Sequence, residues 1–71
     1  MKVYRLHHNG EVINFFDSLE QVAQTIKEEI KKHEDLHPKK IMNVQEENRT
    51  VIIYQYWTLY TEMFMIEEIE K

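Results

Sequence analysis

The sequence predicts an α+β fold with the element order ββαββ, in which two hairpins form one antiparallel sheet and a single amphipathic helix packs on one face. Three observations predict it: an Asn-Gly pair between two β-rich runs, apolar residues at helical spacing, and a second β-rich stretch after the only proline. At 71 residues, without cysteine, the chain is expected to form one domain, residues 1–71.

The first hairpin is predicted by Asn9-Gly10, because a two-residue type I′ turn needs positive φ at both central positions and this dipeptide adopts it at little cost. The turn joins runs 3–8 and 11–16. The expected register pairs His8 with Glu11, Leu6 with Ile13 and Tyr4 with Phe15. It places Tyr4, Leu6, Ile13 and Phe15 together on the core side of the sheet.

The helix is expected to begin after Asp17 or Ser18, each of which can accept a hydrogen bond as an N-cap. Pro38 ends the helical region, because the residue before a proline is disfavoured in the α conformation. One apolar stripe identifies the buried face of the helix: Leu19, Val22, Ala23, Ile26 and Ile30.

The second half predicts a third strand over 41–45, a turn at 46–49 and a long fourth strand over 50–60. Side chains alternate between the two faces of the fourth strand. One face, expected to point towards the helix, carries Val51, Ile53, Trp57 and Leu59. The other, expected to point outwards or towards a partner, carries Ile52, Tyr54, Tyr56, Thr58 and Tyr60. Residues 61–71 fit either a continued extended segment or a short helix capped by Thr61, and extended structure is favoured. A fourth strand longer than the third would leave unpaired backbone groups and predicts a homodimer.

Charge is unevenly distributed in this acidic chain of net charge −4. Residues 17–38 hold six acids against three lysines, and residues 61–71 hold four acids against one lysine. Such a surface is repelled by nucleic acid and attracted to basic proteins. There is no signal-peptide pattern or run long enough to span a bilayer, and cysteine is absent, so a cytoplasmic protein is expected.

Residues 33–37, HEDLH, match the H-E-x-x-H pattern of the zincin metallopeptidases. That chemistry needs both imidazoles on one face of an intact helix, together with a third protein ligand. Pro38 is expected to place His37 outside the helix, so the match is interpreted as a helix end. A looser metal site combining His33 or His37 with His7 or His8 is the remaining alternative. Neighbours in a strand point to opposite faces, so only one of His7 and His8 can join it.

No catalytic, cofactor-binding or metal-binding residue is assigned, and an enzyme is not expected. The chain has no Gly-rich phosphate loop and no cysteine nucleophile, and its only serine, Ser18, is engaged as a helix cap. Paired acids at Glu28/Glu29 and Glu46/Glu47 are adjacent in sequence, which does not by itself create a shared, desolvated site.

The leading hypothesis is therefore a small acidic protein-binding module, a homodimeric regulator or inhibitor that mimics nucleic acid towards a basic nucleic-acid-binding protein. In general character it resembles small phage inhibitors of DNA-binding proteins, without any shared motif. Seven acids are expected to face the partner: Glu28, Glu29, Glu34, Asp35, Glu67, Glu68 and Glu70. The alternatives are a structural protein without mimicry, or a nucleic-acid-binding sheet that uses Tyr54, Tyr56 and Tyr60 with Lys39, Lys40 and Arg49; the same tyrosines could form a dimer interface.

Overall fold

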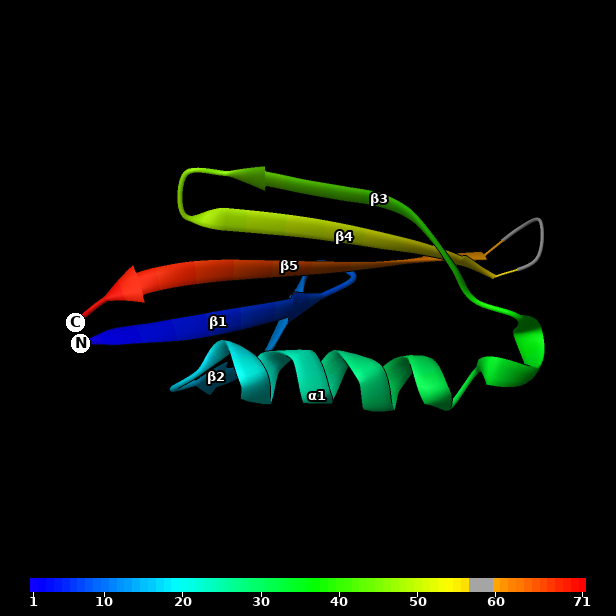
Figure 1. Cartoon of the computed structure of the whole chain (residues 1–71), viewed down its shortest axis with the longest axis horizontal. Coiled ribbons are helices and arrows are strands. Elements are labelled where there is room, and N and C mark those ends of the chain that lie inside the picture. The colour runs from blue at the N-terminus through cyan, green and yellow to red at the C-terminus, as the bar shows by residue number, and fades with distance from the viewer. Residues whose placement is uncertain (57–59) are drawn as a thin grey trace.

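The computed structural model describes residues 1–56 and 60–71 (Figure 1). Its elements are β1 (Lys2–His8), β2 (Glu11–Phe16), α1 (Leu19–Lys31), a short 3₁₀ helix (Glu34–Leu36), β3 (Lys39–Glu46), β4 (Arg49–Tyr56) and β5 (Tyr60–Glu70). The strands form one antiparallel sheet in the order β2-β1-β5-β4-β3. The predicted α+β class, with one helix against one antiparallel sheet, is confirmed, and the sheet has five strands where four were expected.

β5 is the main difference from the expected topology. The chain reverses between β4 and β5, so that Tyr56 pairs with Tyr60, although no Gly or Pro marks a turn there. Residues 61–71 are extended, as favoured, but they form a separate strand between β1 and β4. The expected overhang of a long fourth strand is therefore wrong, because β4 is paired on both sides.

The first hairpin forms around the expected turn, with positive φ at Asn9 (52°) and Gly10 (90°). His8 pairs with Glu11 as predicted, but an irregularity beside Leu6 leaves Ile13 as an extra residue, and Tyr4 consequently pairs with Phe16. A shift of one residue exchanges the two faces of a strand. Phe16 therefore packs on the core, and the predicted core positions Ile13 and Phe15 are exposed.

Local hydrogen bonds explain where α1 begins. The Ser18 hydroxyl accepts from the Gln21 backbone N–H at 3.3 Å, and the Gln21 side chain accepts from the Asp17 backbone N–H at 3.1 Å. This reciprocal pair satisfies backbone donors that have no partner within the helix. Ser18, one of the two predicted caps, is the N-cap.

The core lies between α1 and the middle of the sheet. Val22 and Ile26 of the predicted stripe are buried against Leu6 of β1 and Phe64 of β5. Leu19 and Ala23 remain exposed and line an apolar groove of about 380 Å³ between the helix and β4. Figure 1 shows why: the helix lies along the β1 and β2 side of the sheet, away from β3 and β4.

The two faces of β4 are reversed relative to the prediction. Ile52 and Tyr54 pack against the core on the side of the sheet that carries α1, and Tyr56 is 1% exposed. Because side chains alternate along a strand, Val51 and Ile53 point to the face that carries no helix. The predictions for Trp57, Thr58 and Leu59 fall outside the described residues.

As the sequence predicted, the HEDLH segment does not form a zincin helix. α1 ends at Lys31, and His33 precedes the separate 3₁₀ turn. His37 adopts a left-handed conformation (φ 56°) immediately before Pro38. The two histidines therefore do not share one helix face. Within the described ranges, no helix has the length and apolar character needed to cross a bilayer.

The small core gives a first test of this packing. Ile26→Ala should lower the free energy of unfolding by about 2–4 kcal/mol, because it removes buried methyl groups and leaves a cavity. The matched variant Leu19→Ala changes a residue of the same stripe that is 54% exposed and should cost less than about 1 kcal/mol. Urea denaturation measures both, and equal losses would contradict the position of the helix.

Candidate functional site

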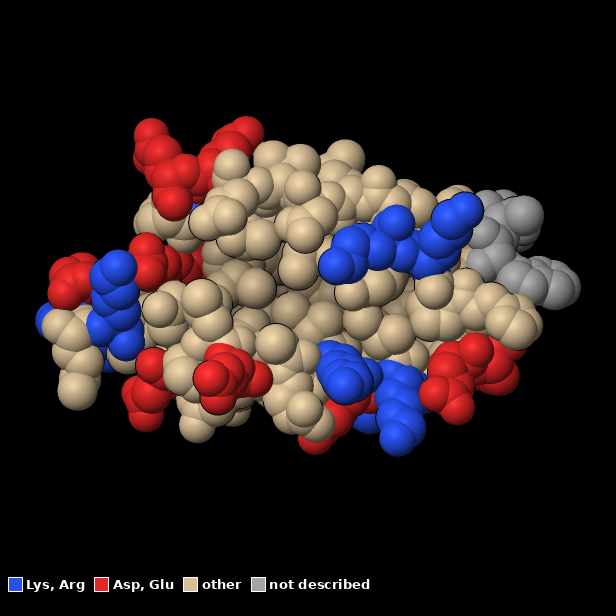
Figure 2. Space-filling view, in the orientation of Figure 1, with Lys and Arg blue, Asp and Glu red and all other residues tan. Residues whose placement is uncertain are grey.

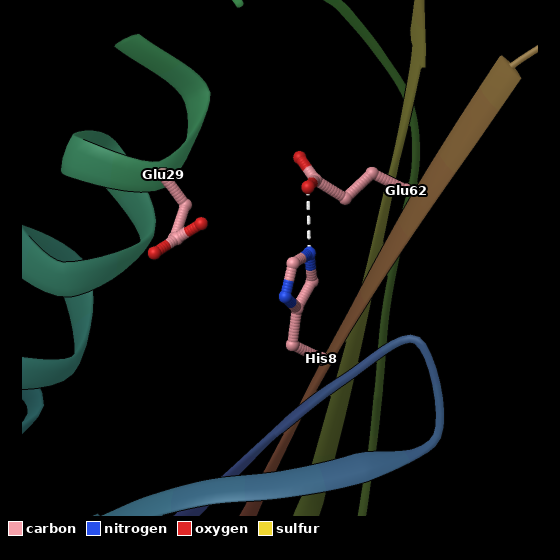
Figure 3. Close-up of side chains that lie close together, drawn as sticks. All are labelled: His8, Glu29 and Glu62. Carbon is pink, nitrogen blue, oxygen red and sulfur yellow. Dashed lines mark hydrogen bonds and ion pairs between the residues drawn. The ribbon is translucent and has the colours of Figure 1, made fainter. Parts of the chain in front are cut away.

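A buried carboxylate lies at the end of the sheet nearest the C-terminus of α1. Glu62 of β5 is 1% exposed, and its carboxylate accepts a hydrogen bond from the Tyr56 hydroxyl. Its other oxygen lies 2.6 Å from Nε2 of His8, the last residue of β1 (Figure 3). A carboxylate removed from water needs such partners, because burying an uncompensated charge is costly.

Aromatic contacts hold the cluster in place. The His8 ring stacks on Phe64 with centroids 4.8 Å apart and an interplanar angle of 6°. Tyr56 packs edge-on against His33 and lies beside Tyr60. Burial, together with the hydrogen bond to Glu62, raises the pKa of Tyr56 far above its usual value, so the phenol stays a hydrogen-bond donor.

Glu29 brings a second carboxylate to this site from α1. Its carboxylate faces His8 and Glu62 in Figure 3, and ligand atoms of these three residues lie within 4.8 Å of one another. Lys32, the C-cap residue of α1, pairs with Glu29 at 3.0 Å. An imidazole and two carboxylates are a donor set that can hold a divalent cation or exchange a proton.

Sequence reasoning did not find this cluster. Glu29 was expected to face a partner, Tyr56 was expected on an outer face, and Glu62 was not singled out. One signal was available: Glu62 is an acid directly before the apolar run 63–66, and alternation along a strand places it on the same face as Phe64 and Ile66. A charged residue on the core side of a strand requires a partner, and the fold supplies His8 and Tyr56.

The opposite face of the sheet carries a charged row. Glu67 of β5 pairs with Arg5 at 2.9 Å and with His7, and its strand neighbour on the other side is Arg49. Arg49 is in turn opposite Glu46 of β3. The hydrogen bond from His7, with the Arg5 contacts, lowers the pKa of Glu67 below its ordinary value.

The seven acids predicted to face a partner do not act as one set. Glu67 pairs with Arg5 and His7, Glu68 pairs with Lys2, and Glu70 pairs with the amino group of Met1. Glu29 belongs to the cluster with His8. Among the described residues, Glu28, Glu34 and Asp35 are exposed and form no ion pair. Figure 2 shows acidic side chains in separate groups on the face it draws.

The residues of the predicted nucleic-acid platform are dispersed. Tyr56 is buried, Tyr54 packs against the core, and Tyr60 is exposed. Arg49 and Tyr54 are five residues apart on β4, about 17 Å along the strand, and five residues place them on opposite faces. The binding role of the three tyrosines stays a prediction, but the structure does not bring them into one exposed surface with Lys39, Lys40 and Arg49.

The loose metal site also differs from its prediction. His7 and His8 point to opposite faces, as expected, and among the histidines only His8 joins a cluster of potential ligands within the part of the chain that the structure describes. The other members are Glu29 and Glu62, whereas His33 contacts Tyr56 and Tyr60.

The face of the sheet without the helix is a second candidate surface. Cross-strand pairing aligns a row over all five strands, in the order Val12, His7, Met65, Val51 and Val44. Ile53 pairs with both Met63 and Met42 in the next row. We call these two rows the open apolar face. Val12, Met42 and Val44 on it are more than 40% exposed.

Comparisons with protein-family models, with curated proteins and with solved structures give no match to this chain.

The Glu67 network predicts an acid-dependent contribution to stability. Because the folded pKa of Glu67 lies below the ordinary 4.5, this contribution is present above that value and is lost as pH falls through the folded pKa. Glu67→Gln should make the stability curve flatter below about pH 5. Urea unfolding between neutral and acidic pH measures it, with Glu20→Gln on the exposed helix surface as control. Parallel curves for wild type and Glu67→Gln would contradict the prediction.

Proposed function

We propose that the chain is a non-enzymatic protein-binding module that pairs with a second copy through the open apolar face. The observation that carries the proposal is the row Val12, His7, Met65, Val51 and Val44, apolar except for His7, which crosses all five strands with no helix over it. Contiguous exposed apolar surface of this kind marks interaction sites in folded proteins. A second copy offers the same surface, and two sheets can pack face to face about 10 Å apart.

The small core supports association. In the described part of the chain, five apolar or aromatic side chains are buried: Leu6, Val22, Ile26, Tyr56 and Phe64. A domain this small needs a further source of stability, and the chain has no cysteine to form a disulfide. Covering the open apolar face would extend the core to both sides of the sheet.

The charged row on the same side of the sheet as the open apolar face is compatible with burial. Arg5, Glu67, Arg49 and Glu46 alternate in sign along one cross-strand row, so each charge already lies beside an opposite one. Pairing within the chain lowers the number of charges that a partner must compensate. The molecule measures 39 Å by 21 Å in its two longest dimensions, which is large enough for the about 800 Å² per partner typical of stable complexes.

The homodimer predicts different effects for two neighbouring residues of β3. Val44→Lys places a charge on the open apolar face and should weaken self-association at least about tenfold, equivalent to about 1.4 kcal/mol. Gln45→Lys places the same charge on the helix side and should leave association unchanged. Sedimentation equilibrium measures both, after circular dichroism has confirmed folding.

Two outcomes would overturn the dimer proposal. One is an 8.8 kDa species alone at high micromolar concentration of the wild-type protein. The other is equal weakening by Val44→Lys and Gln45→Lys, which would place the contact at the edge of β3 rather than on the face.

The nucleic-acid mimic is a sharper form of this proposal and now depends on fewer residues. Glu28, Glu34 and Asp35 are the predicted partner-facing acids that are exposed and form no ion pair within the described residues. Glu28 lies in the last turns of α1, and Glu34 and Asp35 lie in the 3₁₀ helix that follows. Exposed acids near one another in the chain can attract a basic protein and occupy its phosphate-binding surface.

Neutralising these acids tests the mimic. The triple variant Glu28→Gln, Glu34→Gln, Asp35→Asn should weaken capture of a basic nucleic-acid-binding protein at least about tenfold, and salt should weaken wild-type capture. The control is Asp17→Asn, Glu20→Gln, Glu47→Gln, which removes three exposed acids elsewhere. Competition with an oligonucleotide shows whether the partner's nucleic-acid site is occupied. Salt-independent capture, or equal effects of both variants, would contradict the mimic.

A further inference from the structure

His8, Glu29 and Glu62 come from three elements that are distant in the chain. His8 ends β1, Glu29 lies near the end of α1, and Glu62 lies near the start of β5. The fold nevertheless brings one potential ligand atom of each residue within 4.8 Å of the others (Figure 3). We propose that these three side chains bind a divalent transition-metal ion, with Zn²⁺ as the probe ion, and that the ion joins the end of α1 to the sheet.

The charge of the cluster favours a cation. It contains two carboxylates, and among the described residues no lysine or arginine pairs with Glu62. Glu62 is 1% exposed, so water does little to screen its charge. A divalent ion matches the charge of the two carboxylates, while neutral His8 supplies a nitrogen ligand.

The donor set indicates the class of ion. One imidazole and two carboxylates suit a borderline ion such as Zn²⁺, whereas Ca²⁺ and Mg²⁺ prefer oxygen ligands throughout and Cu(I) prefers sulfur. Three protein ligands leave at least one coordination position for water. The proposed role of the ion is structural, because no residue of the cluster is assigned a catalytic role.

The surrounding residues already orient two of the ligands. The Tyr56 hydroxyl bonds one oxygen of Glu62, leaving the other directed at His8. Stacking on Phe64 fixes the plane of the His8 ring. Such supporting contacts are typical of metal sites, where they set the direction of the ligands.

Binding requires two local changes. The ion takes the place of the direct contact between His8 and Glu62, now 2.6 Å, so that each ligand atom can lie about 2.0–2.2 Å from the metal. Glu29 leaves Lys32, whose side chain is 65% exposed. An ion pair this exposed contributes little, so the second change has a small cost.

Glu29→Gln is the decisive variant, because Glu29 lies outside the buried pair formed by Glu62 and Tyr56. Its matched control is Glu28→Gln, one residue away and exposed. Excess Zn²⁺ should raise the Tm of the wild type and of Glu28→Gln by at least about 5 °C relative to chelator, because the ion binds the folded state. Glu29→Gln should lose most of this shift.

Calorimetry and NMR complete the test on the same full-length proteins. Calorimetry should give one Zn²⁺ per chain for the wild type and at least about tenfold weaker binding for Glu29→Gln, since losing even a supporting residue costs that much in metal sites. In NMR spectra, Zn²⁺ should shift the ring resonances of His8 and leave those of His37 unchanged.

The proposal would be overturned by a Tm that does not respond to Zn²⁺. It would also be overturned by equal Zn²⁺ effects in wild type and Glu29→Gln, or by shifts at His37 instead of His8, because these would place the ion on exposed histidines. The site lies on the helix side of the sheet, so failure of the dimer proposal does not affect these outcomes.

Discussion

The pairing of β5 with both β1 and β4 is the constraint on which the remaining structure depends. Each hairpin alone is a two-stranded ribbon, and such ribbons are marginally stable in water. β5 hydrogen-bonds to one strand of each hairpin and makes them a single sheet. It also places the two ends of the chain together, where the Lys71 backbone N–H donates to the Met1 carbonyl at 2.7 Å. Without β5, α1 would have only the β1–β2 hairpin to cover.

Alternation along β5 gives the molecule two chemically different faces. Glu62, Phe64 and Ile66 point towards α1, so this strand supplies both the centre of the core and the buried carboxylate. Met63, Met65 and Glu67 point the other way and form part of the open apolar face and its charged row. One strand thus positions the candidate metal ligands and the candidate interface, on opposite sides of the sheet.

Local signals in the sequence predicted the elements whose geometry has a local cause. Asn9-Gly10 and the Ser18 cap act through nearby backbone, and the turn and the helix start are found where they indicated. Pro38 was expected to end the helical region, but α1 ends earlier, at Lys31, and a separate 3₁₀ helix precedes the proline. The register beyond Leu6 and the reversal before Tyr60 depend on partners elsewhere in the sheet, and no Gly or Pro marks either. The exchanged faces of β4 follow from the missed reversal, because β5 rather than a longer β4 lies at the centre of the sheet. His8, Glu29 and Glu62 converge only through that topology, so spacing in the chain could not group them.

The two proposed ligands bind opposite faces of the sheet, and both stabilise the folded state. An ion at His8, Glu29 and Glu62 would hold the end of α1 against the sheet, and a second copy would cover the face that α1 leaves open. Each ligand binds the folded chain, so each stabilises it by mass action even without contact between the two sites. In a chain with a core this small, binding at one site increases the folded population and so increases the population that can bind at the other site. A direct allosteric effect would require a second folded arrangement that each ligand recognises differently. The shared backbone of β5, with Glu62 facing one site and Met65 the other, is the physical connection through which such an effect would act.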